Sequence, residues 1–113
     1  MNEEWKDIKG FEGLYQVSNL GQVRGKRGVL KPYINHKGYL KVCLSKEGVK
    51  YKKRVNRLVA EAFIKNPLNL PQVNHKDRNK NNNAVTNLEW CTAKENRDHF
   101  RKIKKQEQNE SFQ

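Results

Sequence analysis

The sequence is poor in cysteine, in acidic residues and in long apolar runs. Its two cysteines, Cys43 and Cys91, lie far apart, so the CxxC spacing of zinc sites and a disulfide framework are both missing. The cytoplasm, a reducing compartment, is therefore the expected location. No run approaches the roughly 20 apolar residues that span a bilayer. The polar start MNEEWKD is also unlike a secretory signal.

Apolar residues are scarce, whereas positive charge is abundant. Hydrophobic residues make up 35% of the 113 residues, which predicts a lean core within one domain or two small subdomains. The chain has 24 Lys and Arg against 12 Asp and Glu, a formal net charge of +12. This imbalance favours a polyanionic partner. Nucleic acid is the first candidate and an anionic membrane surface is the alternative.

The positive charge is concentrated in residues 22–57, which hold twelve Lys or Arg and a single acid, Glu47. Within this window KGYLKVCLS and VKYKKRV alternate apolar and polar residues, as strands with one buried face do. The intervening KEG predicts a hairpin turn. The resulting ribbon would carry Lys50, Lys52 and Arg54 on a cationic face that can enter a major groove. The alternative is an ordinary sheet with a solvated outer face.

The segments on either side of the ribbon predict a small β unit and a helix. Residues 3–25 contain four glycines between short apolar runs, which indicates short strands or a meander with SNLG as a turn. The expected core of this unit consists of Trp5, Phe11, Tyr15 and Val17. After the ribbon, VNRLVAEAF has apolar residues at helical spacing, and the helix should end before Pro67.

The stretch QVNHKDRNKNNNAVTNLEWCTAKEN, residues 72–96, holds seven asparagines in an ordered arrangement. QVNH and NLEWCT are strand-like, KDRNKNNNAVT between them is a loop, and TAKE matches the S/T-x-x-E capping box of a helix start. This strand, loop, strand and helix can bring Asn74, His75 and Asn96 close together. We interpret NKNNN as a turn-rich loop without a catalytic part.

Three motifs together resemble the His-Asn-His (HNH) endonucleases of the phage and intron homing type. VNHKDRNKNNN and NLEWCTAKEN match the ββα-metal motif of that family, and EEWKDIKGFEGLYQVSNLGQVR resembles the nuclease-associated modular DNA-binding motif found in front of HNH domains. RLVAEAF matches the helix that joins the two. The resemblance implies an α+β fold, in which a small N-terminal antiparallel β unit plus helix precedes a ββα-metal nuclease motif.

The resemblance also implies a division of the chain and an activity. The expected segments are a β-rich DNA-binding motif in 1–54, a connecting helix in 55–66, the nuclease motif in 67–104 and a disordered tail in 105–113. The implied activity is metal-dependent hydrolysis of DNA phosphodiester bonds with Mg²⁺ or Mn²⁺. The implied partner is double-stranded DNA, with no small-molecule cofactor, in the cytoplasm of a bacterium or a phage-infected cell. A monomer or homodimer, and nicking or double-strand cutting, remain open.

Within the asparagine-rich stretch, the resemblance implies a role for individual residues. His75 matches the general base that activates water, and Asn87 matches the middle Asn that braces the histidine loop. Asn96 matches the third position of the motif, a metal ligand, and Asn74 matches the second ligand, which in the family is often Asp. An imidazole with a pKa near ~6.5 can accept a proton at neutral pH. Amide oxygens add no negative charge, so such a site should bind metal weakly until DNA arrives.

The candidate DNA-binding residues are mostly cations of the ribbon and of the turn before it. They are Arg24, Lys26, Arg27, Lys41, Lys50, Lys52, Arg54 and His99. The alternative function is a catalytically degenerate HNH-like protein that binds DNA as an accessory or regulatory factor, and an RNA-directed version is a more distant one. The endonuclease requires His75 and a divalent metal, whereas the binding protein requires neither.

Overall fold

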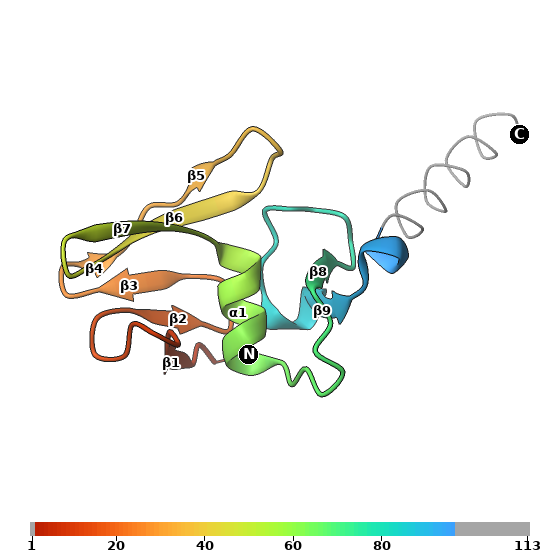
Figure 1. Cartoon of the computed structure of the whole chain (residues 1–113), viewed down its shortest axis with the longest axis horizontal. Helices are drawn as coiled ribbons and strands as arrows, with labels where there is room; N and C mark the ends of the chain where they lie inside the picture. Colours follow the sequence, from red (N-terminus) through yellow and green to blue (C-terminus); the bar gives the residue numbers. More distant parts are fainter. Residues whose placement is uncertain (1, 97–113) are drawn as a thin grey trace, which may run out of the picture.

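The computed structural model describes residues 2–96 (Figure 1), and this part of the chain is an α+β fold. A four-stranded antiparallel sheet contains β1 (Trp5–Asp7), β2 (Gln16–Ser18), β3 (Val23–Gly25) and β4 (Gly28–Val29) in that order. A three-stranded sheet contains β5 (Tyr33–Ile34), β6 (Leu40–Lys46) and β7 (Val49–Arg54). Helix α1 (Val55–Phe63) follows, and then a hairpin of β8 (Gln72–His75) and β9 (Leu88–Cys91) with the short 3₁₀ helix η1 (Val85–Asn87) in its loop. Within residues 2–96 no helix is long and apolar enough to cross a membrane.

The N-terminal sheet is the meander that the glycine pattern predicts. At the SNLG turn the Ser18 hydroxyl oxygen accepts hydrogen bonds from the backbone N–H groups of Leu20 (3.2 Å) and Gln22 (3.1 Å). Phe11 and Val17 are buried as expected. The prediction that Trp5 belongs to the core is wrong, because its half-buried ring lies on the sheet surface beneath the guanidinium of Arg24, 4.0 Å from the ring centroid.

Strands β6 and β7 form the expected ribbon. Val42 and Leu44 are buried and Cys43 between them is exposed, which confirms the alternation in β6. The expected buried face of β7 is wrong, because Val49 and Tyr51 are 49% and 39% exposed. Glu47 (φ 53°) and Gly48 (φ 79°) make the two-residue turn, and two positive φ angles in succession match the right-handed twist of a hairpin. The ribbon is not two-stranded, however, because β5 adds a third strand to it.

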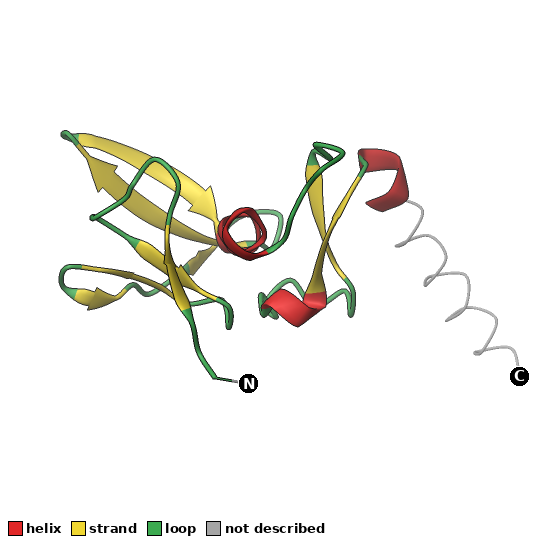
Figure 2. Ribbon diagram, turned by 90° about the horizontal axis from the view of Figure 1, so that it is seen from below, coloured by secondary structure: helices red, strands yellow, loops and turns green. Residues whose placement is uncertain are grey.

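Helix α1 lies between the sheets and the β8–β9 hairpin, where Figure 2 shows it end-on. It contacts β2, β6 and β7 as well as β8, β9 and η1, and its buried stripe includes Val55, Leu58 and Val59. The helix ends at Phe63, before the expected end of segment 55–66, because Ile64 already has extended backbone angles (φ −116°, ψ 119°). Since α1 packs on both sides, it fixes the hairpin relative to the sheets.

A second contact joins the N-terminal sheet to the asparagine-rich loop. The backbone N–H of Val85 donates to the carbonyl oxygen of Asn19 at 2.8 Å. Gly21, with φ of +90°, approaches so closely that a Cβ on it would lie 3.0 Å from the Cβ of Asn83. The loop after β8 is therefore held in place by the turn after β2.

Candidate active site

His75 ends strand β8 and is almost completely buried, with 2% of its surface exposed. Its Nε2 lies 2.7 Å from Oδ1 of Asn83. An amide oxygen only accepts, so Nε2 carries the hydrogen and the neutral ring keeps its lone pair on Nδ1. Burial lowers the pKa of His75 below its usual value, as does the charge of Lys80, while the hydrogen bond to Asn83 and the carboxylate of Asp77 act in the opposite direction. Burial thus favours the neutral form of the His75 ring.

The ring of Tyr39 lies beside the ring of His75, with centroids 6.1 Å apart and planes inclined by 36°. Tyr39 is itself contacted by two cations, the guanidinium of Arg54 at 4.3 Å and the ammonium of Lys80 at 4.6 Å from its centroid. Lys80 also donates to the carbonyl oxygen of Lys37 at 2.8 Å. The basic ribbon and the asparagine-rich loop therefore meet at the histidine.

The asparagine-rich loop is organised by Asn87 and Asp77. Nδ2 of Asn87 donates to Asp77 Oδ1 (2.9 Å) and to the carbonyl oxygen of Asn82 (2.8 Å), and the backbone N–H of Asp77 donates back to Asn87 Oδ1 (3.1 Å). The Asn82 side chain, the backbone N–H of Asn79 and the Asn87 side chain all donate to the Asp77 carboxylate and lower its pKa. The loop is turn-rich, as expected. Asn83, however, contacts the ring of His75, a contact that the prediction for NKNNN did not include.

Two amide side chains have unpaired oxygens, that of the buried Asn74 in β8 and that of the half-buried Asn96 in the helical turn after β9. Nδ2 of Asn74 donates to Oε1 of Glu89 at 2.9 Å, and Nδ2 of Asn96 donates to Oε1 of Gln72 at 3.1 Å. Both Oδ1 atoms are buried without a hydrogen-bond partner among the described residues. Gln72 and Asn74 are two residues apart in β8, so their side chains leave the same face of the strand. Buried polar atoms without a partner are uncommon, so these two oxygens are candidate contacts for a ligand.

Asn96 owes its position to the start of a helix. The backbone N–H of Glu95 donates to Oγ1 of Thr92 (3.0 Å), and that of Thr92 donates to Oε1 of Glu95 (3.3 Å), which confirms the capping box. Residues 93–96 are helical, so β8, β9 and this turn make a ββα unit. His99 lies outside the described residues.

The structure places Asn74 and His75 next to each other in β8 and Asn96 in the helical turn after β9, and it does not bond the three to one another. The ring of His75 is bonded to Asn83, and the two amides are bonded to Glu89 and Gln72. A groove of about 310 Å³ lies between the hairpin and the ribbon. Its lining includes Lys37, Tyr39, Arg54, Arg57, Gln72 and Asn96. Through Tyr39 it adjoins His75, and through Asn96 it reaches an unpaired oxygen.

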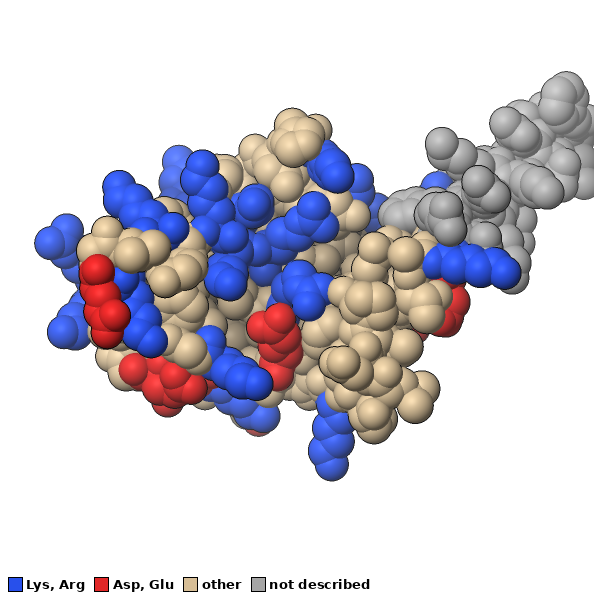
Figure 3. All heavy atoms as spheres, viewed as in Figure 1, with Lys and Arg blue, Asp and Glu red and all other residues tan. Residues whose placement is uncertain are grey.

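Four of the candidate DNA-binding cations lie on one face of the ribbon. The cross-strand pairs are Lys41 with Arg54, Cys43 with Lys52 and Ser45 with Lys50, and residues two apart share a face. None of these four cations forms an ion pair within residues 2–96. Figure 3 shows that Lys and Arg side chains greatly outnumber Asp and Glu over the sheet end of the molecule.

The other candidate cations differ in their surroundings. Lys26 and Arg27 form the exposed turn between β3 and β4. Arg24 is engaged within the chain, because its Nε and Nη2 donate to Gln16 Oε1 at 3.0 and 2.7 Å and its guanidinium covers Trp5. Arg24 therefore contributes to the sheet surface.

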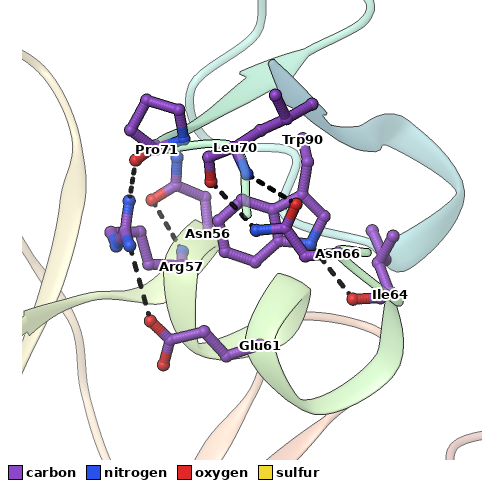
Figure 4. A network of polar contacts seen from close by, with 8 residues as sticks. All are labelled: Asn56, Arg57, Glu61, Ile64, Asn66, Leu70, Pro71 and Trp90. Atoms are coloured by element: carbon purple, nitrogen blue, oxygen red, sulfur yellow. Dashed lines mark hydrogen bonds and ion pairs between the residues drawn. The ribbon is translucent and has the colours of Figure 1, made fainter. Parts of the chain in front are cut away.

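Polar contacts hold the hairpin against α1 (Figure 4). Nη1 of Arg57 donates to the carbonyl oxygen of Pro71 at 2.6 Å, and Nε1 of Trp90 donates to that of Ile64 at 3.0 Å. Another Arg57 nitrogen, Nη2, lies 3.6 Å from Oε1 of Glu61. These contacts fix the angle between β8–β9 and the helix, and therefore the width of the groove.

The donor set of the hairpin suits a hard cation. Within residues 2–96 there is no group of three or more His, Cys, Asp or Glu side chains that could hold a metal ion, and Cys43 and Cys91 are both free. The unpaired atoms that could bind a metal are amide oxygens, which suit Mg²⁺ or Mn²⁺ and not a metal that prefers sulfur ligands. Asn74 and Asn96 therefore offer oxygens of the kind that a hard divalent ion binds.

Sequence reasoning missed three residues of this site. Glu89 could have been found, because pairing QVNH with LEWC in an antiparallel hairpin places it opposite Asn74. Asn83 and Tyr39 carry no such signal. The contacts of Asn83 depend on how the loop folds, and those of Tyr39 join segments far apart in the chain.

A buried histidine at the end of β8, two amides with unpaired oxygens in or bonded to the same strand, and a basic β unit in front are features of the HNH class of nucleases. Comparisons with known proteins agree. The NUMOD4 motif model matches residues 3–45, and the HNH endonuclease model matches residues 53–98. The chain belongs to the HNH endonuclease family of the homing type, with a NUMOD4 motif before the HNH segment.

Individual relatives show the same organisation. The chain is 50% identical over 95 residues to DNA endonuclease I-HmuI of Bacillus phage SP01, covering 82% of this chain and 55% of that protein. It is 47% identical over 92 residues to the uncharacterized HNH endonuclease L245 of Acanthamoeba polyphaga mimivirus, covering 80% of this chain and 28% of that protein. A solved structure titled for DNA binding and cleavage by the HNH homing endonuclease I-HmuI superimposes with a TM-score of 0.77 at 47% identity, over 84% of this chain and 56% of that one. The chain thus spans about half, or less, of the length of these relatives.

Proposed function

We propose that this chain is a divalent-metal-dependent endonuclease that hydrolyses phosphodiester bonds of double-stranded DNA. His75 is the general base, and Asn74 and Asn96 hold one Mg²⁺ or Mn²⁺ ion. The observation that carries this proposal is the pair of buried amide oxygens without partners, that of Asn74 next to His75 in β8 and that of Asn96 in the helical turn after β9. A buried carbonyl oxygen without a partner costs free energy, and a bound metal ion would offset that cost.

His75 has the protonation state and orientation of a base. Since its hydrogen is on Nε2, its Nδ1 lone pair is free to take a proton from the attacking water. Its lowered pKa keeps the ring neutral at pH 7. Asn83 fixes the tautomer, and Asn87 fixes the backbone after His75 through its contacts with Asp77. Tyr39 packs beside the ring, with the two centroids 6.1 Å apart.

The amide oxygens supply the second half of the site. When bound, the divalent ion would neutralise charge that develops on the phosphate and the leaving oxygen. Oδ1 of Asn74 and Oδ1 of Asn96 are the ligands that the chain offers for it. Because both are neutral, the DNA phosphate has to complete the site, and metal affinity should rise when DNA binds.

The basic ribbon and the groove would place DNA against this site. Lys41, Lys50, Lys52 and Arg54 form a cationic face, and Arg54 continues into the groove with Asn96. A backbone running along the ribbon would then deliver a phosphate between Tyr39 and Asn96. This arrangement supports double-stranded DNA as the substrate.

Incubation with supercoiled plasmid tests the proposal. We expect nicked or linear DNA with Mg²⁺ and with Mn²⁺, and intact DNA with a chelator. Retarded but uncut DNA under every metal condition would establish the alternative, a DNA-binding protein with a degenerate HNH site.

A further inference from the structure

Glu89 lies directly opposite Asn74 in the β8–β9 hairpin, and their side chains are joined by the 2.9 Å hydrogen bond from Asn74 Nδ2 to Glu89 Oε1. A carboxylate accepts hydrogen bonds and donates none. The amide of Asn74 can therefore face Glu89 only with its NH₂ group. Its oxygen then faces the other way, where it is buried and without a partner.

We propose that Glu89 is a positioning residue that turns the oxygen of Asn74 toward the metal and makes a neutral amide serve where a carboxylate is commonly found. The inference rests on the proposed function, because it presumes that Asn74 Oδ1 is a metal ligand. The negative charge of Glu89 also polarises the amide, which makes Oδ1 a better donor. Asn96 differs, because its partner Gln72 is itself an amide with both a donor and an acceptor.

If Glu89 orients Asn74, the effect of replacing one of these residues depends on the identity of the other. With Glu89→Lys, a donor replaces an acceptor, and the ammonium attracts the Asn74 oxygen away from the metal. With Asn74→Asp added to Glu89→Lys, one carboxylate oxygen pairs with the ammonium and the other remains free for the metal. Asn74→Asp should thus restore the metal affinity that Glu89→Lys removes.

Metal binding can be followed without catalysis. Paramagnetic Mn²⁺ broadens the nuclear magnetic resonance signals of nearby groups, and the side-chain amide of Asn96 is a reporter present in every variant. The measurement is a MnCl₂ titration of the full chain without DNA, and the spectra also show whether each variant is folded. Glu89 is exposed, so its replacement should leave the fold intact.

For Glu89→Lys we expect a Mn²⁺ midpoint raised by about 10-fold or more, the usual effect of losing a residue that orients a ligand. Glu89→Gln keeps an acceptor oxygen and should have a smaller effect. Glu12→Lys, the same charge change at an exposed loop residue, should shift the midpoint by less than about twofold because solvent screens it. Asn74→Asp with Glu89→Lys should return the midpoint to the wild-type value or below it.

Two results would overturn the inference and leave the metal site standing. The first is a Mn²⁺ midpoint of the Glu89→Lys variant equal to that of the wild type. The second is a raised midpoint in Glu89→Lys that Asn74→Asp does not return to the wild-type value. If Mn²⁺ fails to broaden Asn96 in the wild-type chain both without DNA and with a duplex present, the metal ligands of the proposed function fail together with the inference. The two failures are therefore distinguishable.

Discussion

Neutralising Lys50 and Lys52 should weaken the salt dependence of DNA binding by a calculable amount. Both residues are exposed, lie on the cationic face of β7 and form no ion pair within residues 2–96. Each phosphate contact contributes roughly −0.9 to the slope of log affinity against log salt. Two contacts contribute about 1.8, so a fourfold rise in salt should cost the double variant about 12-fold less affinity than it costs the wild type.

The assay is fluorescence anisotropy of a labelled duplex between 50 and 200 mM KCl, a range suggested by the known salt sensitivity of such contacts. Arg54 is left intact in this variant because it packs on Tyr39 beside His75. Replacing Lys6 and Lys46 is the matched control, since their ammonium groups donate to carbonyl oxygens of this chain at 3.4 and 2.8 Å. An unchanged slope in the Lys50 and Lys52 variant, or an equal change in the control, would refute docking through this face.

Three further predictions concern the hairpin. Asn87→Ala removes the two hydrogen bonds that Nδ2 of Asn87 donates. It should lower the free energy of unfolding, measured by urea denaturation, by about 1–3 kcal/mol, and it should also lower the nicking rate. Because the pKa of His75 is lowered, the cleavage rate should rise with pH around a midpoint below about 6.5. Lys80→Gln removes a positive charge that lowers this pKa, so the midpoint of the pH–rate profile should move to higher pH. The same lowered pKa means that the folded chain resists protonation of His75. The stability that comes from keeping His75 neutral should be complete above about pH 6.5 and should be lost as pH falls through the folded-state pKa. The free energy of unfolding should therefore be lower at pH 5 than at pH 7, and His75→Gln should reduce this difference.

Local features of this fold could be read from the sequence. The β6–β7 alternation, the positive-φ turn at Glu47 and the capping box at Thr92 each depend on residues within a few positions of one another. Strands β4 and β5 have two residues each, which is too short for any periodic pattern. The early end of α1 at Phe63 follows from the turn after it, in which Asn66 and Leu70 hydrogen-bond each other twice.

The site was likewise predictable only in part. The resemblance pointed to Asn74, His75, Asn87 and Asn96, whose roles stay predictions. It could not single out Asn83, because the neighbouring asparagines of the loop look alike in sequence while only the packing against Gly21 decides which one is buried. Trp5 was misjudged for a related reason, since a nearby arginine covers its ring and takes the place of core burial.

The central claim is that His75 performs chemistry on DNA and is not needed to bind it. The most direct test compares His75→Ala with wild type in Mg²⁺-dependent nicking of supercoiled plasmid and, in parallel, in duplex binding by anisotropy. The account predicts a nicking rate reduced by about 100-fold or more, the usual contribution of a general base, with affinity close to that of the wild type. Nicking by His75→Ala at the wild-type rate would contradict it.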